Sequence, residues 1–236
     1  MSHPSTSSAY GIWSLNEVRD AERGDNWPSV LVGFALSSAV YDSVSFSVSS
    51  QDGSPMAVRF SNDGTKMYIL GDGTDYIYQY TLSTAHDLST ASYDSVSLYV
   101  NAQENVPLGM AFSSDGTKVY VTGNINDDVS PYTLSTAWDL STATYDGSSF
   151  SAIGGIPTGL VFSNDGTKMY ITNNTGDDID QYSLSTAFDV STASYDSVTL
   201  VISSQTTSPS DLVFNNDGTK LYLIGDSTVF QYTLST

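Results

Sequence analysis

Acidic side chains gather at three corresponding places in the chain, each directly after a short apolar stretch. Because Ca²⁺ prefers several oxygen ligands, each cluster is a candidate metal site. The candidate ligands are Asp72, Asp75, Asp127, Asp128, Asp177, Asp178 and Asp180. Asp and Asn also stabilise tight turns through local hydrogen bonds, and no cluster completes a spaced calcium-loop motif. Calcium is thus the one cofactor that the sequence leaves open, and turn formation is the plainer explanation.

One aromatic position varies in type while the residues around it barely change. It is occupied by His86, Trp138 and Phe188, each directly before an Asp. A displayed ring at this position would suit contact with a glycan or a protein ligand. Large aromatic side chains usually bury most of their area, however, so we favour the alternative that these rings cap a packed core.

The side chains that most often carry out acid–base or nucleophilic catalysis are scarce. The two His residues, His3 and His86, have no obvious partner, and Glu occurs only at Glu17, Glu22 and Glu104. There is no Cys, no Gly-x-Ser-x-Gly, no His-Glu-x-x-His and no phosphate-binding loop motif. We therefore predict no catalytic residue and a protein that is not an enzyme.

The charge of the chain excludes several partners. Its 236 residues carry 26 acidic and 7 basic side chains, which gives a formal net charge of −19. Such a field repels phosphate and argues against binding to nucleic acid. No apolar run reaches membrane-spanning length, and the start of the chain lacks the hydrophobic core of a signal peptide. We expect neither membrane insertion nor export through a signal peptide.

Three sequence elements recur about every 50 residues, as in repeat folds. The tetrapeptide Asp-Gly-Thr-Lys begins at Asp63, Asp115, Asp165 and Asp217. A Tyr-Asp pair begins at Tyr41, Tyr93, Tyr145 and Tyr195, and a Tyr-Thr/Ser-Leu-Ser-Thr segment begins at Tyr80, Tyr132, Tyr182 and Tyr232. Copies of a unit of about 51 residues therefore fill residues 33–236, behind a separate segment of residues 1–32.

Each copy contains four short strand patterns separated by turn residues. In the third copy we expect strands at 159–163, 168–172, 179–184 and 198–202, with a long connection at 185–197. This pattern predicts an all-β, four-bladed β-propeller. An unmatched fourth strand stands at residues 41–50, and we predict that it closes the ring by joining the last blade. Exchange of this strand between two chains is the alternative.

A four-bladed ring is tight, so its innermost positions need small side chains. The corresponding inner positions are occupied by Ala57, Gly109, Gly159 and Asp211. Arg59 and Asp211 are the unusual members of their sets. We predict that they form an ion pair where the first and last blades meet.

The N-terminal segment predicts a short helix. Ser14 and Glu17 form a capping box for a helix over Leu15–Arg23. So short a helix needs a packing partner, which we expect to be the propeller or another subunit. The side chains of this candidate attachment interface are Trp13, Leu15, Val18 and Trp27.

The third copy reads GLVFSNDGTKMYI from Gly159 to Ile171 and resembles the blade consensus of lactonase-like and YVTN-type β-propellers. This resemblance covers residues 51–236 and implies the propeller fold. Lactonase-like propellers include hydrolases whose calcium sites are clusters of Glu, Asn and Asp on the inner strands, whereas the inner positions here are mainly small and apolar. The segment from Tyr10 to Pro28 resembles a short element of tailed-bacteriophage virion proteins.

These features together lead to one functional prediction. We expect a non-enzymatic structural or adhesion protein on the exterior of a tailed-phage virion, such as a tail fibre, a tip or a capsid decoration, made in the host cytoplasm. Its N-terminal segment would bind other virion subunits, and its propeller would bind a host-surface glycan or protein. The alternatives are a free bacterial carbohydrate- or protein-binding propeller and a lactonase-like hydrolase.

Overall fold

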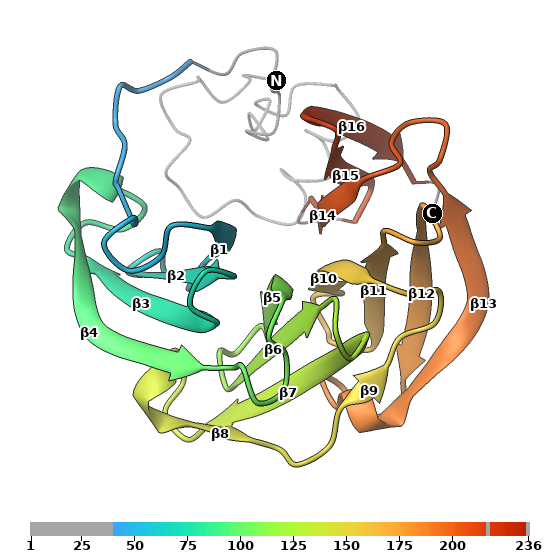
Figure 1. Cartoon of the computed structure of the whole chain (residues 1–236), viewed down its shortest axis with the longest axis horizontal. Coiled ribbons are helices and arrows are strands. Elements are labelled where there is room, and N and C mark those ends of the chain that lie inside the picture. The colour runs from blue at the N-terminus through green and yellow to red at the C-terminus, as the bar shows by residue number, and fades with distance from the viewer. Residues whose placement is uncertain (1–39, 216–217, 235–236) are drawn as a thin grey trace, which may run out of the picture. The chain divides into compact units, whose positions relative to one another are not determined.

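The computed structural model describes residues 40–215 and 218–234. The chain divides into two units, Met1–Asp42 and Ser43–Thr236, and all the described strands lie in the second. Its four antiparallel sheets surround a common centre, with β1, β5, β10 and β14 innermost (Figure 1). The predicted all-β, four-bladed β-propeller is therefore confirmed.

The strands follow the repeats of the sequence. Blade 1 contains β1 (Pro55–Phe60), β2 (Lys66–Gly71), β3 (Tyr76–Leu82) and β4 (Ala91–Tyr99). Blade 2 contains β5 (Pro107–Phe112), β6 (Lys118–Gly123), β7 (Asp128–Leu134), β8 (Ala143–Tyr145) and β9 (Phe150–Ser151). Blade 3 contains β10 (Pro157–Phe162), β11 (Lys168–Asn173), β12 (Asp178–Leu184) and β13 (Ala193–Val201). Blade 4 contains β14 (Pro209–Phe214), β15 (Lys220–Gly225) and β16 (Thr228–Thr233), and the short 3₁₀ helices are η3 (Leu88–Thr90), η4 (Leu140–Thr142) and η5 (Val190–Thr192).

The Asp-Gly-Thr-Lys tetrapeptide forms the turn between the first and second strands. In blade 1 the carboxylate of Asp63 accepts hydrogen bonds from the Ser61 hydroxyl at 2.7 Å and from the Thr65 N–H at 3.0 Å. Gly64 has a φ of +70°, a conformation that costs glycine little. The turn thus depends on a carboxylate acceptor and a glycine, and Lys66 begins the next strand.

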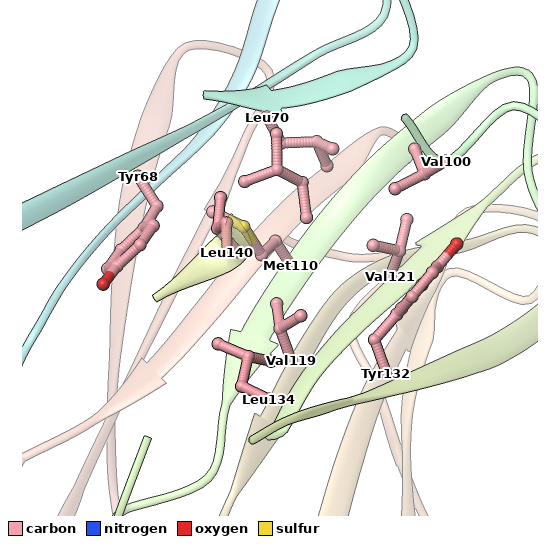
Figure 2. Packing of buried hydrophobic residues seen from close by; sticks show 10 residues of the cluster. Tyr68, Leu70, Val100, Met110, Val119, Val121, Tyr132, Leu134 and Leu140 are labelled. Carbon is pink, nitrogen blue, oxygen red and sulfur yellow. The ribbon is translucent and has the colours of Figure 1, made fainter. Parts of the chain in front are cut away.

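The hydrophobic core lies between successive blades. Figure 2 shows the cluster between blades 1 and 2, where Tyr68 and Leu70 of blade 1 meet Met110, Val119 and Val121 of blade 2. All five side chains are fully buried. Strands with apolar residues on both faces suit this arrangement, because each sheet packs against a neighbour on either side.

The outer strand differs from the expectation in two blades. In blade 3 it begins at Ala193 instead of residue 198, because the Tyr-Asp pair enters the sheet across an irregularity in register. In blade 2 the outer strand is broken into β8 and β9. The interruption faces Pro131 of β7, which has no N–H to donate to a neighbouring strand.

The predicted closing strand is not formed among the described residues. The last blade contains β14, β15 and β16 only, and residues 40–50 carry no strand. Phe46 and Val48 instead pack on the core of blade 1, as Leu98 and Val100 pack on blade 2 one repeat later. Apolar burial therefore holds this segment against blade 1, while its backbone has no strand partner there.

The predictions for the N-terminal segment lie outside the described residues. They concern the helix, the boundary between residues 32 and 33, and the attachment side chains Trp13, Leu15, Val18 and Trp27. Within the described ranges no helix is long and apolar enough to cross a membrane.

Candidate functional site

The inner strands of neighbouring blades approach one another closely. As predicted, Arg59 pairs with Asp211, with 3.0 Å between Nη2 and Oδ2. A Cβ on Gly109 would lie 2.6 Å from the carbonyl oxygen of Thr158, and one on Gly159 would lie 2.8 Å from the Cα of Asp211. The inner backbones of blades 2, 3 and 4 are thus in close contact.

The predicted aromatic positions cover the turns of their own blades. His86, Trp138 and Phe188 all have positive φ and donate their N–H to the carbonyl of Gly64, Gly116 or Gly166 at 2.9, 2.9 and 3.0 Å. Their rings lie directly on these glycines, since a Cβ there would come within 2.1–2.3 Å of ring atoms. This geometry is that of a cap. Ligand contact at these positions stays a prediction.

The predicted metal-ligand carboxylates form hydrogen bonds around the turns between second and third strands. Asp75 accepts from Asn101 at 2.6 Å, and Asp128 accepts from Ser149 and Ser151 at 2.5 and 2.6 Å. Burial and the neighbouring carboxylates of Asp75 and Asp52 raise the pKa of Asp72. In the described part of the chain, no group of three or more His, Asp or Glu side chains is placed to hold a metal ion.

The third acidic cluster is the most buried of the three. Asn173 donates to Asp178 at 3.1 Å and to Asp180 at 2.9 Å, while Asp177 lies in the turn with a φ of +49°. Burial raises the pKa of Asp178, and the carboxylates of Asp180 and Asp177 raise it further. In the second cluster one carboxylate oxygen of Asp127 is buried without a hydrogen-bond partner. Calcium binding at these clusters stays a prediction.

Sequence reasoning missed a set of buried polar anchors in the connections that precede the first strand of each blade. Asp52 and Glu104, each only 2% exposed, accept backbone N–H groups two residues further on and lie against Gly71 and Gly123. Thr206 holds the same position beside Gly225. In blade 3 the polar group comes instead from Asn173, which stands where the other blades have glycine. That exchange is the one signal in the sequence that could have revealed the set.

A cleft of about 560 Å³ opens between blades 1 and 2. We call it the junction cleft. Blade 1 contributes a turn and parts of β3 and β4, and blade 2 contributes the segment around η4. The lining residues are Ser61, Asp63, Thr65, Lys66, Gln79, Asp94, Val96, Thr136, Ala137, Trp138, Asp139 and Ser141.

Lys66 is the one cation in the lining of the junction cleft. Its Nζ lies 2.8 Å from the Asp94 carboxylate and 2.6 Å from the Thr81 hydroxyl. Burial alone would raise the pKa of Asp94, but hydrogen bonds from Lys66, Gln79 and Thr81 outweigh it and lower the pKa. The ammonium is therefore held in place beside an ionised carboxylate.

Gln79 ties the two blades together at the floor of this cleft. Its amide nitrogen donates to Asp94 at 2.9 Å, and its oxygen accepts the N–H of Leu140 from blade 2 at 2.8 Å. The side chain is 4% exposed. Sequence reasoning did not single out Gln79, because the residue carries no charge and occurs within a strand pattern.

Two further carboxylates complete the lining. Hydrogen bonds from Ser61 and Thr65 lower the pKa of Asp63 to about 2. Asp139 caps η4. Its Oδ1 accepts hydrogen bonds from the N–H of Ser141 at 3.0 Å and from the Ser141 hydroxyl at 2.6 Å. A fixed ammonium can stabilise a developing oxyanion, and a carboxylate beside it can accept a proton from water.

Comparison with solved structures supports the propeller fold. A putative 6-phosphogluconolactonase from Bacteroides uniformis is 16% identical with a TM-score of 0.55, covering 77% of this chain and 50% of that one. A putative 6-phosphogluconolactonase from Bacteroides fragilis is 16% identical with a TM-score of 0.56, covering 77% of this chain and 51% of that one. The periplasmic gluconolactonase of Pseudomonas aeruginosa is 14% identical with a TM-score of 0.53, covering 77% of this chain and 50% of that one. The chain thus spans about half the length of these structures.

No curated protein matches the chain. The model of the family described as "Lactonase, 7-bladed beta-propeller" matches residues 45–229. This match confirms the resemblance to lactonase-like propellers, while nothing supports a virion element at the N-terminus.

Two predictions from the sequence are corrected by the family match. The non-enzymatic virion protein is contradicted, its carbohydrate- or protein-binding alternative gains no support, and the conclusion that the protein is not an enzyme is wrong. The sequence search relied on His and Glu, whereas the charged groups that fold into the cleft are Lys and Asp. The described residues form four blades, whereas the family description names seven. With residues 45–229 matched, the chain belongs to this lactonase family of β-propellers.

Proposed function

We propose that this chain belongs to a hydrolase that opens a cyclic ester, and that the junction cleft is its active site. The observation that carries the proposal is the lactonase family match, which includes every residue that lines the cleft. The names of the solved structures with the same fold, two 6-phosphogluconolactonases and a gluconolactonase, support the same class of reaction.

The proposed reaction is the addition of water to the lactone carbonyl carbon. Asp139 takes one proton from the attacking water, and the Lys66 ammonium stabilises the negative charge that forms on the carbonyl oxygen. The bond from the carbonyl carbon to the ring oxygen then breaks, and the proton passes to that oxygen. The product is the open-chain hydroxy acid. Trp138 supplies an apolar wall for the ring of the substrate.

The test is hydrolysis of five- and six-membered lactones by the purified full-length chain, followed as acid release at constant pH. Lys66→Met should lower kcat/KM by about 100-fold or more, since it removes the group that stabilises the oxyanion. Lys118→Met is the matched control, because Lys118 makes the same ion pair with Asp146 at 2.7 Å in blade 2.

Both variants lose one equivalent ion pair, so their melting temperatures should change alike. Equal activity of Lys66→Met and wild type would remove the junction cleft from the proposal. No hydrolysis of any lactone above the spontaneous rate would reject the function itself.

A further inference from the structure

The described residues hold few positive charges that could meet an anionic substrate. Of the five basic side chains in this part of the chain, Arg59, Lys66, Lys118 and Lys168 already form ion pairs with Asp at 2.7–3.0 Å. The fifth, Lys220, donates to the Thr233 hydroxyl at 2.6 Å. Inside the junction cleft a phosphate could meet only Lys66, whose ion pair with Asp94 it would have to break.

The junction cleft itself is negative. One ammonium, from Lys66, lies among the carboxylates of Asp63, Asp94 and Asp139. Both Asp63 and Asp94 have lowered pKa values, so they remain ionised well below neutral pH. The net charge of −19 on the whole chain adds a field of the same sign. A phosphorylated substrate would be repelled on approach and again inside the cleft.

The remaining lining is suited to an uncharged substrate rich in hydroxyl groups. The hydroxyls of Thr65 and Ser141 donate to Asp63 and Asp139, so they face a substrate as acceptors, and Thr136 adds a further hydroxyl to the lining. Trp138 adds apolar surface, which can cover the C–H face of a sugar ring. Carboxylates are strong acceptors for substrate hydroxyls.

We infer that the substrate of the junction cleft is an uncharged, polyhydroxylated lactone and not a phosphorylated one. This inference rests on the proposed function and names its substrate class. It distinguishes the substrate proposed here from the one in the names of two structures with the same fold, on the basis of the carboxylates that line this chain's own cleft.

The experiment compares a six-membered sugar lactone with its phosphorylated counterpart at low and high salt. The uncharged lactone should have a kcat/KM at least about tenfold higher at low salt, and salt should leave it nearly unchanged. The phosphorylated lactone should improve as salt screens the repulsion. A preference for the phosphorylated substrate at low salt would overturn the inference and leave the proposed function standing.

Asp63→Asn sharpens the test by removing one negative charge. At low salt it should raise, several-fold, the ratio of kcat/KM for the phosphorylated lactone to kcat/KM for the uncharged one. Asp165→Asn is the control, because Asp165 makes the same turn contacts with Ser163 and Thr167 in blade 3 and lies outside the cleft lining. Equal responses of the two variants would contradict a local effect of charge.

A binding measurement keeps the inference testable if no lactone is hydrolysed. Calorimetry with the uncharged sugar lactam, and separately with its phosphorylated form, uses ligands that resist ring opening. Tighter binding of the uncharged lactam supports the substrate class even where catalysis fails. Tighter binding of the phosphorylated lactam, or no binding of either, rejects it.

Discussion

The junction between blades 1 and 2 and the junction between blades 2 and 3 are built from the same parts but differ at two places. Both contain an Asp-Gly-Thr-Lys turn and a Lys–Asp ion pair, at 2.8 Å for Lys66 and 2.7 Å for Lys118. Only the first has a glutamine at the floor, where the second has Pro131. Only the first has a Trp cap, where the second has Phe188. The shared Lys–Asp pair does not by itself single out one junction, so a function confined to the first must also depend on the parts that differ, Gln79 and Trp138.

The exchange of Gln79 for Pro131 also affects whether the neighbouring outer strand is continuous. At the first junction β4 is continuous, and Val96 lies opposite Gln79 in the register. At the second, Pro131 removes the donor that a partner strand needs, and the strand is interrupted between β8 and β9. One residue type thus decides whether the junction has a continuous polar floor, and the predictions below test that conclusion.

The largest effect is expected from the two caps. Trp138→Ala and Phe188→Ala should each lower the free energy of unfolding by about 2–3 kcal/mol, because each leaves a partly buried gap above a glycine turn. Trp138→Ala should also raise KM for a lactone, whereas Phe188→Ala should not. Chemical unfolding and steady-state kinetics check the pair. An equal rise in KM would show that the two junctions do not differ in function.

A smaller effect is expected at the floor. Gln79→Ala should cost about 1–2 kcal/mol, since it leaves the N–H of Leu140 without its partner in a buried position. Gln181→Ala is the matched change in blade 3, where the amide donates to Asp196 at 2.7 Å from a less buried side chain. It should cost less. If urea unfolding gives equal values, the link between blades is not what distinguishes Gln79.

Acid should affect the corresponding turns of blades 1 and 3 alike. Hydrogen bonds hold the pKa of Asp63 and of Asp165 at about 2, below the ordinary 3.8. A lowered pKa contributes stability above the unfolded value, and this contribution is lost as the pH falls through the folded value. Melting temperature should therefore stay level down to about pH 4 and fall between about pH 4 and pH 2.

Carboxyl NMR can follow each of these groups through the titration. Asp63→Asn and Asp165→Asn should weaken the acid dependence equally. A difference between them would assign the low pKa to the cleft and not to the turn.

The smallest change in stability is expected from the corresponding lysines of blades 3 and 4. Lys168→Met should cost about 0.5 kcal/mol, as is usual for a surface ion pair, because it removes the bond to Asp196 at 2.7 Å. Lys220→Met should cost less, since Lys220 has no carboxylate partner among the described residues. Thermal melting of the two variants checks this. An equal cost would mean that Lys220 has a partner of the same strength.

The sequence predicts those parts of the fold that depend on local chemistry. The Asp63 and Gly64 turn, the four-strand repeat and the Arg59–Asp211 pair follow from residue type and spacing, and the structure contains them. The strand partner of residues 41–50 could not be predicted from residue type and spacing. It depends on which strand edge lies beside the segment in three dimensions, and in the structure the burial of Phe46 and Val48 holds the segment against blade 1.

Less of the candidate site could be predicted from the sequence. Gln79 gains its role only when Leu140, which lies 61 positions further along, is brought to its side chain. Asp139 and Trp138 were visible as residue types, but their meeting with Lys66 depends on the packing of two blades. The residue pattern of a single repeat does not show which of its side chains will contact the next repeat.

The close approach of the inner strands limits which residues they can carry. A methyl group added at Gly109 would lie 2.6 Å from the Thr158 carbonyl oxygen, and one added at Gly159 would lie 2.8 Å from the Asp211 Cα. Both neighbouring atoms belong to the backbone, which cannot turn aside as the end of a long side chain can. Evolution of this propeller can therefore vary its outer strands far more freely than these two inner positions.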